Sequence, residues 1–207
     1  ILPLRQQIEA QLARVRQEDV DHGAAYRTQE LQQSIQQKWQ QIAQQSLDMS
    51  AADSFALHTA LIGQLMELNQ QVGDFSNLVL DSQLDVSYLM AFLVTDVPRL
   101  SEYLGQARGI GAGVLASGNI NASQQNRLIE LKAGLMLAMA QFDHGMQRAL
   151  ESNTDFSERL AQKRNGVGLG LKNFSQTLDL LIAGNLQQVD RARYFADATA
   201  VIGTIGM

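Results

Sequence analysis

The length, composition and charge of the chain exclude several classes of protein. It has 207 residues, of which 45% are hydrophobic, and its net charge is -5. An acidic balance argues against binding to nucleic acid, which would require a basic face. The chain contains no cysteine, which rules out a disulfide framework, a thiolate metal site and a cysteine nucleophile. Its three histidines are not at the spacing of a metal site, so we expect neither a metal nor a cofactor.

Apolar residues recur with a period of about 3.6 along nearly the whole chain, which predicts an all-helical protein. The first stripe begins at Leu4 and Ile8, and a second stripe, after a phase slip, includes Trp39. If residues 1–46 were continuous, they would form a helix of about 70 Å. Asp19 and His22 interrupt the first stripe. A buried polar pair, a kink at Gly23 or a solvated joint between two bundles would each explain the interruption, and we favour the joint.

The later segments carry recognisable start and stop signals. Ser50, with an acidic residue three positions later, can cap a helix, and Asn121 with Gln124 is a variant of the capping box. Gly118 and Gly184, each followed by asparagine, predict left-handed helix stops. These signals divide the chain into about six helical segments. The fold class predicted is therefore all-α, an elongated antiparallel bundle arranged either as one bundle or as two stacked four-helix bundles.

Two glycine-rich stretches stand out, "YLGQARGIGAG" at 103–113 and "RNGVGLG" at 164–170. A phosphate-binding loop would need a preceding β-strand, whereas a helical stripe precedes the first stretch. Gly105, Gly109 and Gly113 lie four residues apart and would share one helix face that permits close approach of another backbone. We therefore expect the two stretches to face each other or to line one cavity.

The middle of the chain resembles the extracytoplasmic sensor region of bacterial methyl-accepting chemotaxis proteins and related sensor kinases. The resemblance rests on the order and spacing of residues within 72–109, and looser matches upstream and downstream extend it over most of the chain. The matching positions are Val72, Asp74, Ser76, Leu78, Leu80, Asp81, Tyr88, Leu89, Met90, Pro98, Leu100, Leu104, Gly105, Arg108 and Gly109. The family often has Pro-Asp after Leu-Asp and a double tyrosine, where this chain has Ser82-Gln83 and a single Tyr88.

The resemblance implies a periplasmic domain held between two transmembrane helices of an inner-membrane receptor, which functions as a homodimer. No apolar run here reaches the about 18–20 residues that cross a bilayer. Both ends of the chain look cut. We therefore expect residues 1–207 to be a single extracytoplasmic helical sensor domain excised from a membrane-anchored receptor.

Four residues are candidates for ligand binding: Arg108, Arg99, Tyr88 and Asn77. The planar guanidinium of Arg108 suits a carboxylate or another oxyanion, although an arginine in a bundle is more often solvated or ion-paired. Arg99 has the same ambiguity. Tyr88 can pack its ring in the core and offer its hydroxyl to a ligand or to another partner.

The residues suggest no catalytic set, so we do not expect an enzyme. The function that we favour is sensing of a small molecule, in its sharper form an anionic ligand of Arg108, with helix displacement carrying the signal across the membrane. An alternative is a module that docks a periplasmic binding protein, in a sensor kinase or another transmembrane signalling protein. A purely structural bundle is the third possibility.

Overall fold

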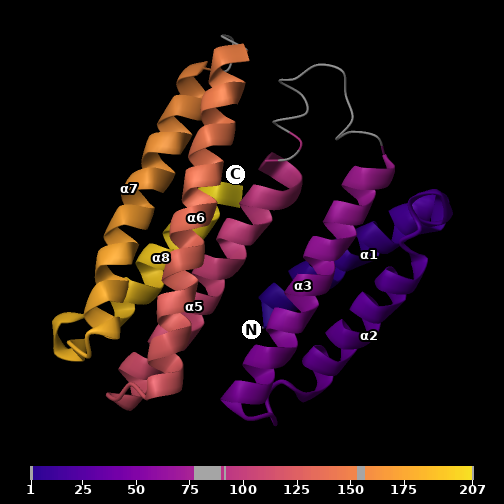
Figure 1. The fold of residues 1–207 in the computed structure, drawn as a ribbon. Coiled ribbons are helices and arrows are strands. Elements are labelled where there is room, and N and C mark those ends of the chain that lie inside the picture. The colour runs from indigo at the N-terminus through magenta and orange to yellow at the C-terminus, as the bar shows by residue number, and fades with distance from the viewer. Residues whose placement is uncertain (1, 77–89, 91, 153–156, 207) are drawn as a thin grey trace. The chain divides into compact units, whose positions relative to one another are not determined.

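The computed structural model describes residues 2–76, 90, 92–152 and 157–206. Within these ranges it contains seven α-helices and no strand, so the prediction of an all-α protein is confirmed. The chain divides into two compact units, Ile1–Asp81 and Ser82–Met207 (Figure 1). None of the helices in the described ranges is long and apolar enough to span a membrane.

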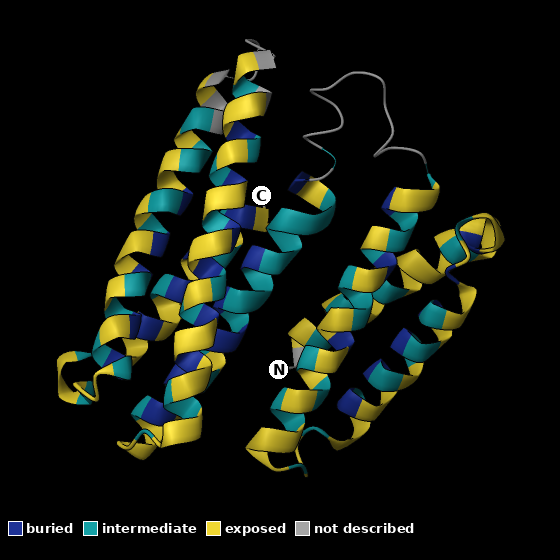
Figure 2. Cartoon of the chain, in the orientation of Figure 1, coloured by how far each residue is buried: buried dark blue, intermediate teal, exposed yellow. Residues whose placement is uncertain are grey.

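Unit 1 consists of three helices, α1 (Leu2–Tyr26), α2 (Gln29–Gln45) and α3 (Ala51–Phe75). Its core is small: Ile35, Trp39 and Ile42 of α2 are buried against Leu61 and Leu68 of α3. Figure 2 shows that the opposite side of α2 is exposed, and most glutamines of this helix lie there, as the sequence predicts. Because α2 is amphipathic with a period of 3.6, its polar residues face solvent without loss of the apolar stripe.

The first two helices are not continuous, so a single helix over residues 1–46 is wrong. The backbone of Arg27 has φ 55°, in the left-handed region that ends a helix, and α2 starts two residues later. The hydroxyl of Thr28 donates a hydrogen bond of 2.5 Å to Asp19 Oδ1 across the turn. Asp19 therefore closes a hairpin inside unit 1, and our interpretation of a joint between two bundles is also wrong.

Unit 2 surrounds an apolar core with four long helices. After the π-helix η2 (Phe92–Asp96) come α5 (Val97–Ser117), α6 (Ala122–Ser152), α7 (Ser157–Ile182), the 3-10 turn η4 (Leu186–Gln188) and α8 (Arg191–Gly206). Each of the four long helices contributes fully buried side chains. The largest of these are Tyr194, Phe142, Phe174, Leu100, Leu104 and Leu128. Burying large apolar and aromatic side chains of this kind is the main stabilising contribution of a helical bundle.

The predicted helix ends are confirmed where the structure describes them. The Ser50 hydroxyl accepts a hydrogen bond from the backbone N–H of Asp53. Asn121 and Gln124 form the reciprocal pair of a capping box, at 2.8 and 3.1 Å. Gly118 and Gly184 have φ of 66° and 77° and end their helices. The sequence also predicts a helix break at 153–155, which lies outside the described residues. It predicts a last helix from near Gln187, whereas α8 begins at Arg191.

The glycines of 103–113 do permit close approach, but at a different position from the predicted face. A Cβ on Gly105 or Gly113 would meet nothing within 4 Å, whereas a Cβ on Gly111 would lie 2.2 Å from the hydroxyl oxygen of Tyr194. In the second stretch, a Cβ on Gly170 would lie 2.6 Å from Val201. Tyr194 and Val201 both belong to α8. Each of the two stretches therefore allows α8 to approach closely. At these positions both stretches contact α8, whereas we expected them to face each other or to line one cavity.

Candidate anion site

The candidate site is centred on Arg108, in the second half of α5. Its side chain is half-buried and reaches helix α8. Its guanidinium carbon lies 4.6 Å from the centroid of the Phe195 ring, in a cation–π arrangement. Its Nη1 atom donates a hydrogen bond of 2.8 Å to Thr199 Oγ1. Arg108 thereby connects α5 with a face of α8 that lies 91 residues further along the chain.

Phe195 and Thr199 are four residues apart on α8, so their side chains share one face of the helix. The Thr199 hydroxyl donates to the backbone carbonyl of Phe195 at 2.7 Å, and its oxygen is therefore the acceptor for Arg108. One N–H of the guanidinium is used in this way. A guanidinium carries five N–H donors in a fixed plane, so most of its hydrogen-bonding capacity remains.

The charge of Arg108 is not balanced by a carboxylate in the described part of the chain. Burial lowers the pKa of Arg108, and the only opposing influence comes from Tyr194. Arginine nevertheless remains protonated at neutral pH because its intrinsic pKa is so high. Arg164 of the same unit, by contrast, is paired and donates two hydrogen bonds to Asp143, at 2.6 and 2.8 Å. Arg108 is thus a partly desolvated cation that has no anionic partner among the described residues.

Tyr194 fixes the backbone next to this cation. Its hydroxyl donates a hydrogen bond of 2.5 Å to the carbonyl of Ala107, and its ring stacks on Phe174 with 5.2 Å between centroids. Burial raises the pKa of the Tyr194 phenol far above its usual value, so the hydroxyl stays neutral. The residue before Arg108 is therefore held to α8 by a buried bond, which limits how the arginine can move.

Of the two predicted ligand residues that the structure describes, Arg108 and Arg99, only Arg108 is found at this place. Arg99 lies nine residues before Arg108 on the same helix, about two and a half turns away and so on the opposite face. It lies near Asp96, whose pKa is raised by burial and lowered to a smaller extent by the charge of Arg99. Asn77 and Tyr88 lie outside the described residues. The structure therefore does not bring Arg99 and Arg108 together.

The sequence did not indicate Phe195 and Thr199 as partners of Arg108. Their spacing of four residues in "ARYFADATAVIG" is visible in the sequence, but this spacing occurs on every amphipathic helix. Which face of α8 meets α5 depends on the packing at Gly111, which no local pattern shows. The fold and the site together define a class: an all-helical domain with a half-buried cation that no described carboxylate pairs, suited to a small anionic ligand.

Comparison with known proteins specifies this class further. The model of the NIT family, described as nitrate and nitrite sensing, matches residues 2–206, and the chain belongs to this family. No curated protein and no solved structure matches the chain. NIT domains are extracytoplasmic sensor domains of membrane-bound signalling proteins, so the predicted class of sensor domain is confirmed. That the receptor serves chemotaxis remains a prediction.

Proposed function

We propose that this domain binds nitrate or nitrite at Arg108 and reports the binding through a movement of α8 relative to α5. The observation that carries the proposal is the half-buried guanidinium without a carboxylate partner in the described residues. The family's description, nitrate and nitrite sensing, supplies the class of anion. A planar oxyanion that carries one negative charge would neutralise a site that holds one positive charge.

The chemistry of Arg108 suits such a ligand. Nitrate is planar, and a guanidinium presents parallel N–H donors in one plane, so that two oxygens of the anion can be bound at once. Partial burial strengthens these charge-assisted hydrogen bonds, because the surroundings screen them less than water does. The Phe195 ring supports one face of the guanidinium and leaves its edge available to the anion.

Arg108 also provides a route from binding to signal. Its hydrogen bond to Thr199 and its contact with Phe195 both cross from α5 to α8. An anion that competes for the same N–H group would favour an arrangement in which α8 is shifted along or around α5. Helix shifts of about 1–2 Å are a known means of signalling. The anion must bind one arrangement more tightly than the other for any signal to result. The receptor context that we propose is a transmembrane chemoreceptor.

Calorimetric titration of the domain with nitrate and with nitrite tests the site. We expect Arg108→Ala to weaken binding at least about tenfold, since a hydrogen bond to a charged group contributes about 1.5–3 kcal/mol. The matched control is Arg193→Ala, because Arg193 lies on α8 but its side chain is 82% exposed and paired with Asp197. Chloride and sulfate, titrated in parallel, distinguish selective binding from a general response to salt. Unchanged nitrate affinity in Arg108→Ala would remove this arginine from the site.

The proposed movement can be measured separately. Because the chain has no cysteine, single cysteines introduced at the exposed Ala116 of α5 and Ala200 of α8 can be labelled without side reactions. We expect nitrate to change the distance between two spin labels at these positions, and Arg108→Ala to abolish the change. An identical distance distribution with and without bound nitrate would contradict signalling through α8.

A further inference from the structure

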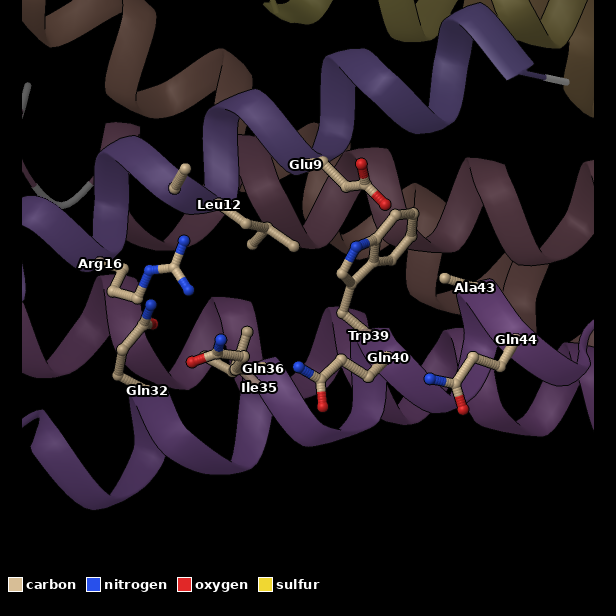
Figure 3. A pocket seen from close by; sticks show the side chains of 11 residues that line it. Glu9, Leu12, Arg16, Gln32, Ile35, Gln36, Trp39, Gln40, Ala43 and Gln44 are labelled. Carbon is tan, nitrogen blue, oxygen red and sulfur yellow. The ribbon is translucent and has the colours of Figure 1, made fainter.

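Unit 1 contains a groove that the proposed function does not use. It lies between α1 and α2, has a volume of about 520 Å³ and is lined only by residues of these two helices (Figure 3). Pockets for small ligands typically have volumes of about 300–1,000 Å³ and combine an apolar floor with a few polar groups. This groove has such a composition: Leu12 and Ile35 are apolar, while Glu9, Arg16 and Gln32 are polar.

The register of the two helices is fixed by hydrogen bonds at both ends of the hairpin. At the open end, Arg5 donates to the carbonyl of Ala43 at 2.9 Å, and at the turn Thr28 donates to Asp19 at 2.5 Å. In the antiparallel register between these bonds, Arg16 lies opposite Gln32, and Glu9 lies opposite Trp39. Figure 3 shows the same two pairs, Arg16 with Gln32 at one end of the groove and Glu9 with Trp39 further along it.

Gln32 is the most informative residue of the groove. Its side chain is only 5% exposed, and its Oε1 atom has no hydrogen-bond partner in the described structure. A buried acceptor without a donor costs about 1–3 kcal/mol. Glutamine at this buried position of an otherwise apolar stripe therefore lowers the stability of the free domain. The oxygen itself is closed to solvent, so an N–H donor of a ligand, such as an ammonium group, would remove this cost only after the Gln32 side chain turns toward the groove.

Arg16 supplies the complementary group at the same end of the groove. It is exposed, and no ion pair or hydrogen bond of its side chain is found among the described residues. A guanidinium binds a carboxylate through two parallel hydrogen bonds. The head group of an α-amino acid contains a carboxylate next to an ammonium group. Arg16 offers a cation for the carboxylate, and the neighbouring Gln32 offers an acceptor for the ammonium group.

A second set of residues, further along the groove, would select the side chain of the ligand. Beyond the apolar residues Leu12 and Ile35, the indole of Trp39 lies beside the carboxylate of Glu9 (Figure 3). An aromatic face and a carboxylate together favour a cationic group, since the ring quadrupole and the negative charge both attract it. From these residues we infer that the α1–α2 groove binds an α-amino acid with a basic side chain, such as lysine or arginine.

This ligand is distinct from the anion proposed for Arg108. Glu9 and Arg16 are separated by seven residues of α1, about 10 Å along the helix axis, so nitrate cannot contact both. Nitrate also has no donor for the Gln32 acceptor. The groove lies within unit 1 and Arg108 within unit 2, so each proposal can fail while the other holds.

The test is calorimetric titration of the 207-residue domain with lysine, arginine, norleucine and nitrate. We expect lysine or arginine to bind one per chain, with affinity reduced at least about tenfold in Arg16→Ala and binding lost in Gln32→Leu. Gln32→Leu should leave the free domain at least as stable as the wild type, because it removes an unpaired buried oxygen. Thermal unfolding without ligand checks that this variant is folded.

Two matched controls lie on the same helices outside the groove. Arg14→Ala on α1 and Gln37→Leu on α2 change exposed residues of the same types and should bind the amino acid normally. Absence of lysine and arginine binding to the wild type would overturn the inference, as would full binding by Gln32→Leu. Norleucine binding as tightly as lysine would contradict the role of Glu9, and displacement of lysine by nitrate would show a general anion site in its place.

Discussion

The two units of the chain bury their side chains to different degrees. In unit 2, four long helices surround a core in which Leu100, Phe142 and Leu178 are completely buried. In unit 1, three helices bury only five apolar residues, and the groove between α1 and α2 stays open. The apolar stripes of α1 and α2 are thus left partly uncovered along this groove. Unit 1, whose core is incomplete, therefore has room for a ligand between its helices. Unit 2, whose core is closed, holds its candidate ligand residue, Arg108, half-buried at its surface.

The sequence offers a way to observe each unit separately. The single tryptophan, Trp39, lies in the core of unit 1, whereas unit 2 has none. Its fluorescence therefore reports the unfolding of unit 1, and the helical circular dichroism reports both units.

Phe142→Ala should destabilise unit 2 by about 3–5 kcal/mol, because it leaves a cavity at a fully buried position next to Phe92. Urea unfolding followed by circular dichroism measures the loss, while the Trp39 fluorescence transition should keep its midpoint. The control Leu137→Ala, at a position 63% exposed on the same helix, should change stability by less than about 0.5 kcal/mol. Equal shifts of both transitions in Phe142→Ala would show that the two units unfold as one.

Gly111→Ala and Gly113→Ala should have opposite effects although they lie two residues apart on α5. At Gly111 the new methyl group would overlap the Tyr194 hydroxyl, and we expect a loss of about 1–3 kcal/mol. At the exposed Gly113 it meets nothing, and the better helix propensity of alanine should stabilise the protein by about 0.5–1 kcal/mol. Thermal unfolding of the two variants measures both. A stable Gly111→Ala variant would contradict the close packing of α8.

Tyr194→Phe should destabilise unit 2 by about 1 kcal/mol, since it removes the buried hydrogen bond to Ala107 but keeps the ring. Urea unfolding gives the magnitude. Tyr103→Phe, at a half-buried position of α5, is the control and should change stability less. If Tyr194→Phe were neutral, the bond to the Ala107 carbonyl would contribute nothing to holding α8 in place.

Asp143→Asn should produce the smallest effect, a change in the pH dependence of stability. The hydrogen bonds from Arg164 lower the pKa of Asp143 in the folded state. The folded protein therefore gains stability above the unfolded pKa of the carboxyl, and loses it as the pH falls through the folded pKa. Because both side chains are partly exposed, the gain should stay below about 1 kcal/mol. Urea midpoints of the wild type and Asp143→Asn should converge in acid; a constant difference would contradict the pair.

Glu102 should change stability with pH in the opposite direction. Burial raises the pKa of Glu102, and Gln106 and Arg127 lower it to a smaller extent. The folded state holds this proton more tightly than the unfolded chain does. Stability should therefore be greatest below the unfolded pKa of the carboxyl and should decrease as the pH rises through the folded pKa. Glu102→Gln should remove this slope in the same measurement, and an unchanged slope would assign it to another group.

The sequence by itself determined the features that depend on neighbours within about four residues. The period of 3.6 predicted the helices, the pair Asn121 and Gln124 predicted a helix start, and Gly118 and Gly184 predicted helix ends. Each of these signals is local, because helical hydrogen bonds and caps join residues close in the chain. Arg108 could be identified as a candidate because its residue type and its place in a family pattern are also visible in the sequence.

Only the tertiary structure decided which helix faces meet. It placed Arg108 against Thr199, selected Gly111 as the position of close approach, and put Arg99 on the opposite side of α5. It also turned the chain at Arg27 and left the buried Gln32 oxygen beside the groove without a partner among the described residues. These outcomes depend on side chains that are distant in sequence and on their fit to one another. A pattern repeated on every amphipathic helix shows that a face is buried, but the partner of that face is set by packing alone.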